Sequence, residues 1–320
     1  MILITGGAGY VGCHVNKKLS NLQYDTLILD NLAYGHKSSV KWGKFIHGNF
    51  GDYHVLADIF SQYKIEAVMH LSAFAYVGES VTDPAKYYVN NLENTIHLLN
   101  MMIRFNIRNF IFSSTCSIYG IPNSSPIRED HNQCPINPYG KSKFMIEQIL
   151  IDYQHAYGLN FISLRYFNAA GADPDGEIGE NHCPETHLIP SVINTALGIN
   201  EFLNIFGSDY PTPDGSCIRD YIHVNDIADA HIKALQYLES EGKSDVFNLG
   251  NEKGISVFEI IECVKKISNR PIQIKMSERR AGDPPMLIAS LQKVKKVLNW
   301  SPVFTDIQDI VSSAWNWHEK

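Results

Sequence analysis

The first dozen residues constrain the fold of this chain more than any other stretch. The apolar run Ile2–Thr5 is typical of a buried strand, and the amphipathic pattern that follows Tyr10 predicts a helix. Glycines at positions 6, 9 and 12 lie around this junction. Because glycine has no side chain, such a turn lets backbone N–H groups approach a pyrophosphate at the positive end of the helix. The spacing G-x-x-G-x-x-G, a variant of the dinucleotide fingerprint, therefore predicts a dinucleotide site, with a plain turn as the alternative.

An acidic residue ends the second predicted strand, Thr26–Asp30, about twenty residues beyond the glycines. A carboxylate at this position accepts hydrogen bonds from the hydroxyls of the adenosine ribose and repels a 2′-phosphate. The sequence therefore predicts NAD rather than NADP as the cofactor. The alternative, that Asp30 only caps the next turn, remains open at this stage.

Strands and helices alternate through the first half of the chain, which predicts an α/β fold with a doubly wound parallel sheet of Rossmann type over residues 1–170. From residue 171 to 320 the alternation weakens, and we expect a smaller mixed α/β domain that mainly binds substrate, with some segments returning to the sheet. No linker marks the boundary. The further strands are expected at 45–47, 67–72, 109–114, 161–165 and 246–249, and the helices at 52–63, 84–105, 138–157, 226–240, 256–268 and 306–318.

Two segments of the second half, 172–190 and 207–216, are rich in Pro, Gly, Asp and Glu. They are too polar for a core and too long for ordinary connections. Long loops of this kind commonly carry binding residues, so we predict that both contribute to a ligand site.

A tyrosine and a lysine lie four residues apart at the start of the predicted helix 138–157. Asn137 suits the N-cap and Pro138 the first turn, so Tyr139 and Lys143 fall on one face of the helix. A cation beside a phenol favours the phenolate, which lowers the pKa of the tyrosine toward working pH and makes it a general base. Thr115 follows the fifth strand and is expected at the same edge of the sheet. The alternative is an ordinary helix with a packed tyrosine and a solvated lysine.

Charge and cysteine usage exclude several classes of function. A net charge of −7 and the absence of a run of Lys and Arg argue against a nucleic-acid-binding surface. The six cysteines are scattered without a C-x-x-C pair, which favours reduced thiols over a disulfide framework or a metal site. There is no apolar run of membrane-spanning length and no signal-peptide pattern. We therefore expect a cytoplasmic protein that binds neither nucleic acid, membrane nor metal.

Several motifs together carry a resemblance to a known family. They are the glycine loop, Asp30-Asn31-Leu32, Ser113-Ser114-Thr115, Tyr139 with Lys143, Arg165-Tyr166-Phe167-Asn168 and Arg219-Asp220-Tyr221-Ile222-His223-Val224. The chain resembles the extended short-chain dehydrogenase/reductases and, among them, the UDP-glucose (UDP-galactose) 4-epimerases. The similarity covers essentially the whole chain, and the motifs of the second half are the more specific ones.

The resemblance implies an isomerase of carbohydrate and galactose metabolism that converts UDP-galactose reversibly to UDP-glucose through a transient 4-keto intermediate. NAD would be tightly bound and not consumed. Tyr139 would take the proton of the sugar 4-hydroxyl, Lys143 would hold the cofactor ribose, and Thr115 would bridge substrate and tyrosine. Members are commonly homodimers, and the helices predicted at 84–105 and 138–157 are amphipathic enough to pair with a second subunit, although packing within one chain would produce the same pattern.

The resemblance also implies two sets of contacts. The cofactor contacts are expected at Gly6, Gly9, Tyr10, Val11, Gly12, Asp30, Asn31, Asn49, Phe50, Leu71, Ala73, Ala75, Asn90, Thr115, Tyr139, Lys143 and Phe167. The UDP-sugar contacts are expected at Thr115, Tyr139, Asn168, His187, Leu188, Asn204, Phe206, Arg219, Arg280, Asp283 and Leu287. Charges at Arg219, Arg280 and Asp283 suit a pyrophosphate and a ribose or uracil edge, although surface ion pairs are an alternative reading of them.

Four residues depart from the family pattern and leave the preferred sugar open. Asn49 stands where an acid often meets the adenine, and Ala75 where many members carry lysine. His187 replaces a common amide, and Leu287 replaces a bulky tyrosine that excludes N-acetylated sugars in some members. UDP-arabinose (UDP-xylose) and UDP-N-acetylhexosamine 4-epimerases therefore remain alternatives.

Two other classes rank lower. A nucleotide-sugar 4,6-dehydratase needs an acid–base pair, usually Asp-Glu, directly after the hydroxyl residue, whereas this chain has Cys116-Ser117. A regulatory protein that binds NAD without catalysis would be expected to lose Tyr139, Lys143 or Thr115 first, and all three are present.

Overall fold

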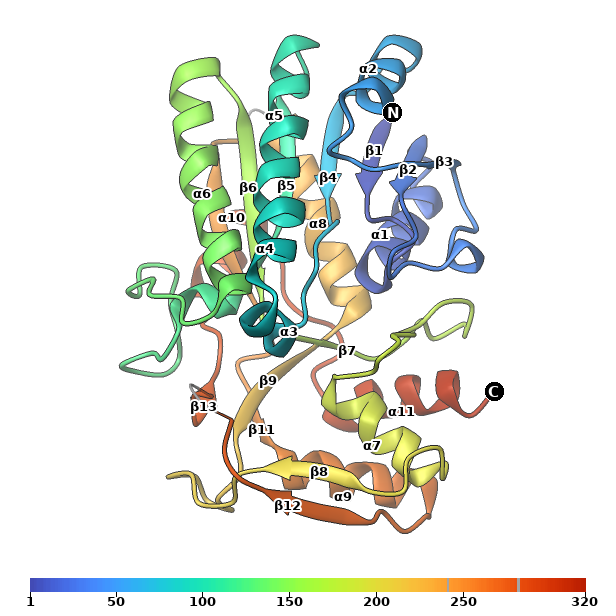
Figure 1. Cartoon of the computed structure of the whole chain (residues 1–320), viewed down its shortest axis with the longest axis vertical. Coiled ribbons are helices and arrows are strands. Elements are labelled where there is room, and N and C mark those ends of the chain that lie inside the picture. The colour runs from blue at the N-terminus through green and yellow to red at the C-terminus, as the bar shows by residue number, and fades with distance from the viewer. Residues whose placement is uncertain (241, 281–282) are drawn as a thin grey trace.

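A seven-stranded parallel sheet forms the larger lobe of the computed structural model, which describes residues 1–240, 242–280 and 283–320 (Figure 1). The strand order β10-β6-β5-β4-β1-β2-β3 reverses direction at β1, as in a doubly wound fold. The prediction of a Rossmann-type parallel sheet is therefore confirmed. Its strands are β1 (Ile2–Thr5), β2 (Thr26–Asp30), β3 (Lys44–His47), β4 (Ala67–His70), β5 (Asn109–Thr115), β6 (Asn160–Tyr166) and β10 (Asp245–Leu249).

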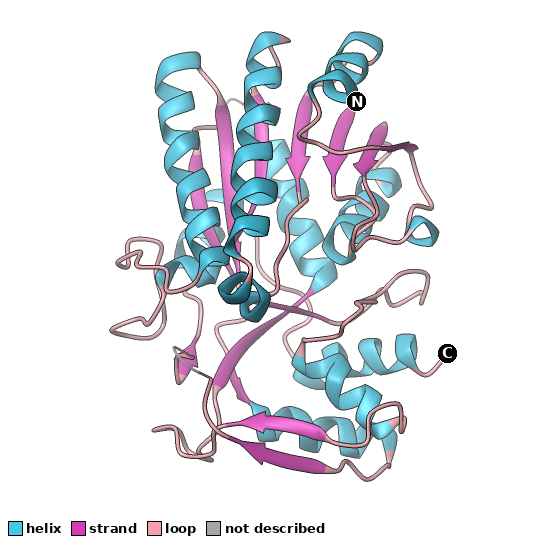
Figure 2. Ribbon diagram, in the orientation of Figure 1, coloured by secondary structure: helices cyan, strands magenta, loops and turns pink. Residues whose placement is uncertain are grey.

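Helices cover both faces of this sheet because its central strands are apolar on both sides (Figure 2). On one face α1 (Tyr10–Asn21) packs against α8 (Val224–Glu239), and α10 (Gln292–Leu298) joins the same hydrophobic core. On the other face α2 (Tyr53–Gln62), α5 (Asn94–Arg104) and α6 (Pro138–Tyr157) share a second core. Strand β10 and helix α8 come from the second half of the chain, so segments of that half also belong to the larger lobe.

The helix predicted at 84–105 is interrupted in the structure. After α3 (Val77–Thr82), α4 (Pro84–Tyr87) leads into a π-helical stretch, Tyr88–Glu93, before α5 begins. Inside that stretch the amide of Asn91 accepts the backbone N–H of Phe74 and donates to its carbonyl, at 2.9 Å each. A π turn offsets the side chains around it, and such turns often occur at functional sites. Here it holds the segment that follows β4.

The smaller lobe is built around β9 (Ile218–His223), which pairs with β7 (Asn168–Ala170), β11 (Gly254–Ser256) and β13 (Met286–Leu287). Strands β8 (Leu203–Phe206) and β12 (Ile274–Ser277) form a separate ladder. Helices α7 (Leu188–Ala196), α9 (Val257–Ser268) and α11 (Ile307–His318) enclose the lobe's own core. The loop predicted at 172–190 is therefore shorter, because α7 begins at Leu188. None of the described helices is long and apolar enough to cross a membrane.

A buried ion pair joins α6 to the sheet. Arg165 on β6 donates from Nε to both carboxylate oxygens of Glu147 on α6, at 3.0 and 3.2 Å, and both side chains are at most 3 % exposed. The hydroxyl of Ser114 on β5 donates to the same carboxylate, and Arg165 also donates to the hydroxyl of Tyr119 at 2.9 Å. Thus one network fixes the helix that carries Tyr139 and Lys143 against the two strands beneath it.

Arg165→Met should destabilise the protein strongly, because it leaves the Glu147 carboxylate buried without its partner. The expected loss is about 3–5 kcal/mol in the free energy of unfolding. Chemical denaturation followed by circular dichroism measures it. Arg128, whose ion pair with Asp130 is 61 % and 70 % exposed, supplies the control, and Arg128→Met should cost less than about 1 kcal/mol. Equal losses in the two variants would contradict the role given to the buried pair.

Candidate active site

In the glycine turn after β1, two glycines are required by packing and a third leaves space for a ligand. A Cβ on Gly12 would lie 2.1 Å from the carbonyl oxygen of Gly6, and Gly6 itself has a positive φ of +77°. Gly12 is therefore required by the contact between the turn and α1, and Gly6 by its backbone conformation and by the backbone of Ser72, 2.6 Å from where its Cβ would lie. Gly9 differs, because a Cβ there would meet only the Gly6 carbonyl, at an ordinary 3.4 Å. Gly9 is the N-cap of α1 and lines a pocket, so its bare backbone leaves the positive helix end accessible to an anion.

Asp30 sits in the same pocket and ties the turn to the end of β2. Its two carboxylate oxygens accept the backbone N–H groups of Ala8 at 3.0 Å and of Leu32 at 2.8 Å. Burial raises the pKa of Asp30 above its ordinary value, while the two N–H bonds oppose that shift. A carboxylate with four lone-pair positions can accept further hydrogen bonds from ribose hydroxyls. The pocket thus combines an anion-binding helix end with a ribose acceptor.

The structure gathers eight of the expected cofactor residues around this pocket, namely Gly6, Gly9, Asp30, Asn31, Phe50, Leu71, Ala73 and Asn90. Sequence reasoning missed the others that line it, which are Ala33, Tyr34, Gly35, Gly48, Ser72 and Phe74. Ser72 and Phe74 adjoin expected residues after β4 and were within reach of the same argument. Tyr34 and Gly35 lie in a loop that carries no local signal.

Asn49 and Ala75 do not line this pocket. The side chain of Asn49 accepts the backbone N–H of Gly51 at 2.8 Å, so it shapes its own turn, and Ala75 is exposed. Their expected cofactor contacts remain predictions. Phe50 does reach the pocket and packs edge-on against His70, with ring centroids 4.8 Å apart.

Gly9→Ala and Gly12→Ala should separate cofactor binding from folding. Gly9→Ala should change the free energy of unfolding by less than about 1 kcal/mol, because its φ of −80° suits alanine. It should nevertheless lower the amount of NAD retained after purification, because the methyl group occupies the pocket. Gly12→Ala should cost about 1–3 kcal/mol or more through the clash. Full NAD retention in Gly9→Ala would contradict this assignment.

Tyr139, Thr115 and Lys143 meet at the carboxyl ends of β5 and β6. The side chain of Asn137 caps α6 through the N–H of Gly140 at 2.8 Å, as predicted. Thr115 is the last residue of β5 rather than the residue after it, and its hydroxyl acts to lower the pKa of the Tyr139 phenol. Lys143 donates from Nζ to the backbone carbonyl of Ser113 at 2.7 Å. The three side chains were predicted to lie at the carboxyl edge of the sheet, and in the structure they lie there.

The sequence predicted a lowered pKa for Tyr139, but the protein without ligands does not have one. Burial raises the pKa of this phenol well above its ordinary value, and the Thr115 hydroxyl only partly opposes that shift. Burial also lowers the pKa of Lys143 to about 7, while the charge of Glu147 one turn further along acts in the opposite direction. The sequence argument considered the two side chains without their burial. A phenolate at Tyr139 therefore requires further positive charge in the pocket.

The expected UDP contacts gather along β9 and its neighbours. Arg219 on β9 pairs with Asp283, and Leu287 on β13 lies opposite Arg219 in the parallel register. The guanidinium of Arg280 lies over the ring of Phe206, 3.9 Å from its centroid. Asn168 on β7 pairs in register with Tyr221 of β9, and Asn204 lies on β8, two residues before Phe206. These residues, far apart in the sequence, form a basic and aromatic region of the smaller lobe.

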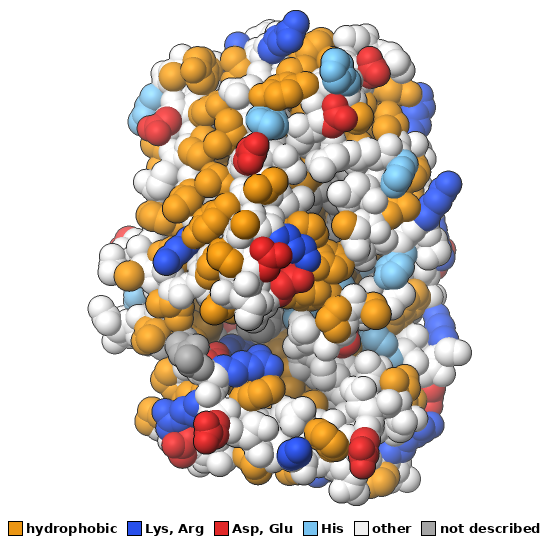
Figure 3. All heavy atoms as spheres, viewed as in Figure 1, with side chains coloured by type: hydrophobic (Ala, Val, Ile, Leu, Met, Phe, Trp, Pro, Cys, Tyr) orange, Lys and Arg blue, Asp and Glu red, His pale blue; other side chains and the backbone are white. Residues whose placement is uncertain are grey.

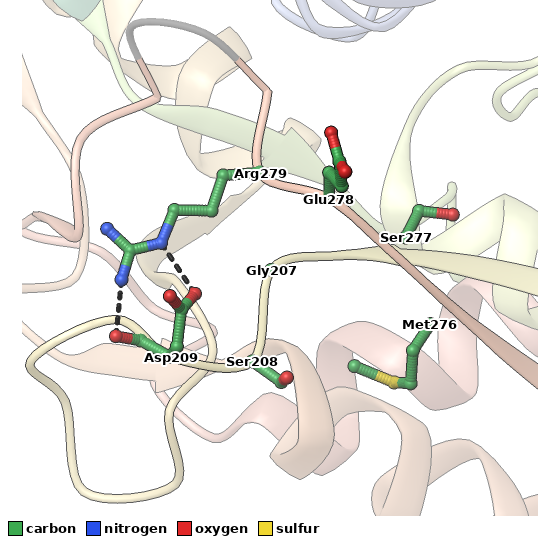
Figure 4. Close-up of a pocket in the computed structure, with 7 residues that line it drawn as sticks. All are labelled: Gly207, Ser208, Asp209, Met276, Ser277, Glu278 and Arg279. Carbon is green, nitrogen blue, oxygen red and sulfur yellow. Dashed lines mark hydrogen bonds and ion pairs between the residues drawn. The ribbon is translucent and has the colours of Figure 1, made fainter.

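A neighbouring surface pocket is formed where residues 207–209 meet residues 276–279 (Figure 4). Arg279 donates from Nε to the carboxylate of Asp209 at 2.6 Å and lies over the ring of Tyr210. This exposed pair joins the segment that follows Phe206 to the segment that precedes Arg280. Sequence reasoning missed both members of the pair, and the adjacent arginines at 279 and 280 were the available signal.

His187 lies in a cluster with Glu180, His182 and Glu185, whose donor atoms all lie within 4.8 Å of one another. Nδ1 of His187 contacts Oε1 of Glu180, which is almost fully buried. The negative charge gathered there raises the pKa of His187 to about 9. Among the described residues this cluster has the donor types that suit a metal ion, and Leu188, another expected substrate contact, follows it directly at the start of α7.

A glycine turn, an acid at the end of β2 and a Tyr/Lys pair at the carboxyl edge define a dinucleotide-dependent α/β enzyme. Residues 2–250 match the family described as NAD dependent epimerase/dehydratase. The chain is 48% identical to a UDP-glucose 4-epimerase of Lacticaseibacillus casei over 319 residues, covering 99% of this chain and 96% of that protein. It is 47% identical to the enzyme of that name from Rhizobium meliloti (strain 1021), covering 100% and 97%.

A solved structure agrees with these relatives. The UDP-glucose 4-epimerase of Brucella ovis in complex with NAD superimposes with a TM-score of 0.96 at 46% identity, covering 98% of this chain and 97% of that one. The chain therefore belongs to the NAD dependent epimerase/dehydratase family, and its cofactor is NAD.

Proposed function

We propose that this protein interconverts UDP-galactose and UDP-glucose by epimerisation at C4, with NAD retained in the site. The observation that carries the proposal is the placement of Thr115, Tyr139 and Lys143 at the sheet edge that the dinucleotide pocket also occupies. A hydroxyl pair at this position can take a proton from a sugar hydroxyl and return it. Full-length similarity to UDP-glucose 4-epimerases supports this reaction over its alternatives.

The residues present fit NAD. The open backbone at Gly9 and the N-terminus of α1 would hold its pyrophosphate, and Asp30 would accept hydrogen bonds from its adenosine ribose. Lys143 would hold the second ribose. When bound, NAD supplies the hydride acceptor and donor and, in its oxidised form, a positive charge. Because the sugar leaves at the oxidation level at which it entered, the cofactor is not consumed.

Tyr139 is the proposed general base and acid. It takes the proton of the 4-hydroxyl on its Oη and returns a proton after the sugar ring has turned over. Thr115 holds the 4-oxygen and the phenol in one line of hydrogen bonds, and Lys143 adds positive charge. Since burial alone raises the pKa of Tyr139, the phenol is protonated in the empty site and would lose this proton to solvent when the positive charge of the oxidised cofactor lowers its pKa. This order protects the buried site from an isolated charge.

The UDP end of the substrate is assigned to the smaller lobe. Arg219 and Arg280 would neutralise the diphosphate, Phe206 would pack on the nucleoside, and Asp283 would accept from the ribose or uracil. The remaining contacts are assigned by similarity to Asn168, His187, Leu188, Asn204 and Leu287. Leu287 is smaller than tyrosine and 9% exposed, so UDP-N-acetylhexosamines and UDP-pentoses stay as alternative substrates of the same site.

Residues 1–170 would thus mainly bind the dinucleotide, and residues 171–320 mainly the UDP-sugar. We assign the protein to the cytoplasm because all six cysteines are free.

Tyr139→Phe should lower kcat by roughly 10²- to 10⁴-fold, because it removes the only proton-carrying atom of the side chain. NAD should remain bound, since the phenol ring is kept. Tyr153→Phe is the matched control on the same helix, where the hydroxyl bonds Asn100 at 2.7 Å and should leave kcat nearly unchanged. Turnover by Tyr139→Phe at the rate of the native protein would contradict the assignment.

The substrate is identified by incubating the purified protein, without added NAD, with UDP-galactose, UDP-N-acetylgalactosamine and UDP-arabinose separately. NMR of the products should show UDP-glucose from UDP-galactose. Faster conversion of the acetylated or pentose sugar would identify a different preferred substrate for the same reaction. A 4-keto-6-deoxy product would replace epimerisation by dehydration, and bound NAD without any turnover would favour a regulatory protein.

We also propose that the protein is a homodimer that pairs through the face formed by α5 and α6, where hydrophobic side chains gather (Figure 3). Val89, in the π-helical stretch, and Met145, on α6, are apolar and 52% and 41% exposed. The stretch and α6 pack against each other, so the two residues can belong to one apolar surface.

Met145→Glu should convert the dimer to a monomer, because it places a charge in the proposed contact. Light scattering coupled to gel filtration measures the mass. Ile199→Glu, at an exposed apolar position just beyond α7 in the other lobe, is the control and should leave the mass unchanged. A native protein with the mass of one chain would overturn this proposal without affecting the proposed reaction.

A further inference from the structure

The segment between β7 and α7 folds back on itself and gathers four side chains of the types that bind transition metals. Glu180, His182, Glu185 and His187 each offer one donor atom, and these atoms all lie within 4.8 Å of one another. Ligand atoms around a tetrahedral zinc ion lie roughly 3.3 Å apart, given bonds of about 2.0–2.1 Å. Small side-chain rotations would therefore bring the four atoms onto one ion.

The two buried carboxylates of the cluster carry negative charge, which favours a bound cation. Glu180 is 3% exposed, and the side chain of Glu185 is 11% exposed. Burying two carboxylates side by side is costly unless positive charge compensates them. Among the described residues, neither carboxylate pairs with a lysine or an arginine, and their ion-pair partners are the two histidines alone.

His182 gives a second, independent indication. Its Nδ1 is buried and lies 3.1 Å from Oε1 of Glu180, yet the contact lacks the alignment of a hydrogen bond and no other described residue supplies a partner. A buried nitrogen without a partner is rare in folded proteins. Nδ1 of His187 bonds Oε1 of Glu180, whereas Nδ1 of His182 lies beside the same oxygen without bonding it, so this nitrogen is available to a shared metal ion.

A second acidic group in the same segment differs from the Glu180 cluster. Asp173, Asp175 and Glu177 also converge, but Nζ of Lys17 lies 2.7–2.8 Å from all three. This lysine offsets part of the acidic charge, Asp175 and Glu177 are 75% and 44% exposed to water, and the group contains no imidazole. The Glu180 cluster differs because its carboxylates are more buried and two imidazoles lie beside them.

We propose that Glu180, His182, Glu185 and His187 form a structural zinc site, a role that goes beyond the proposed epimerisation and does not depend on it. Two imidazoles and two carboxylates suit Zn²⁺ in tetrahedral geometry and leave no open position for chemistry. The scattered cysteines, without C-x-x-C pairs or regular histidine partners, predicted no metal, and a site of two glutamates and two histidines lies outside that pattern.

The site would join the two lobes beside the dinucleotide pocket. Trp317 of α11 donates to the carbonyl of Glu180, and His36, next to the pocket residue Gly35, lies 2.9 Å from the carbonyl of Asn181. The rings of Tyr10 and Tyr76 pack edge-on against His182. Zinc bound here would fix the segment that leads to Leu188, and would stabilise the folded protein in proportion to its affinity.

The first test measures metal in the protein as purified with its NAD. Mass spectrometry of the digested protein should find about one zinc ion per chain. After treatment with a chelator, zinc titrated against an indicator dye should rebind at one site and raise the Tm. Cobalt substituted for zinc should give the intense visible bands of a tetrahedral site without a thiolate charge-transfer band. Failure to rebind zinc, or a thiolate band from the neighbouring Cys183, would overturn the proposed ligand set.

The second test uses variants of two ligands that the proposed reaction does not need, His182→Asn and Glu185→Gln. Each should weaken zinc binding by roughly 100-fold or more and abolish the zinc-induced rise in Tm. Asp175→Asn, in the group paired with Lys17, is the matched control and should bind zinc as the native protein does. Circular dichroism and the retained NAD show whether each variant is folded. Unchanged binding in both folded ligand variants would overturn the proposal, and the cobalt spectrum of the native protein decides the matter if neither variant folds.

Discussion

The buried ion pair between Glu147 and Arg165 is the interaction on which the geometry of the site depends. It connects α6 to β6, and the hydroxyl of Ser114 extends it to β5. Thr115 follows Ser114 directly, and Lys143 lies one helical turn before Glu147. The two sides of the proposed proton-transfer site are therefore held by one network. A buried pair of this kind adds little net stability, but the loss of one partner is costly, so it serves mainly to fix one arrangement.

Burial gives the site an electrostatic character that neither Tyr139 nor Lys143 has alone. It raises the pKa of the phenol and lowers that of the ammonium to about 7, so each group is driven toward its neutral form. A neutral phenol beside a neutral amine is a weak base. The electrostatic potential at Tyr139 becomes more positive only when a charged ligand enters, and in this proposal that ligand is the oxidised cofactor. Chemistry at Tyr139 is thereby coupled to occupation of the pocket that contains Gly9 and Asp30.

Local signals predicted the large lobe well. Helix α6 runs from Pro138 to Tyr157 as expected, because Asn137 caps it and Gly158, in the left-handed conformation, ends it. The strands of the smaller lobe, β7, β8, β9, β11, β12 and β13, and the helices α7 and α10 were not predicted. For β7, β11 and β13 the reason is that two or three residues carry no periodicity, and only pairing with distant β9 makes them strands. The depressed pKa of Lys143 was missed for the same kind of reason, since burial is a property of the whole fold. Glu180 and its neighbours escaped notice because their spacing matches no familiar metal motif.

The proposed zinc site would also affect substrate binding, because the Glu180 cluster adjoins α7. The cluster ends at His187, which caps α7, and Glu185 accepts the backbone N–H groups of Thr186 and His187 at 2.7 and 2.8 Å. The two residues just before α7 are thus held by Glu185, one of the side chains that would bind zinc. With Nδ1 of His187 engaged by the cluster, its Nε2 is the ring nitrogen left to donate to a diphosphate. The replacement of the family's common amide by this histidine would then make substrate affinity depend on the metal, a coupling that an amide would not provide.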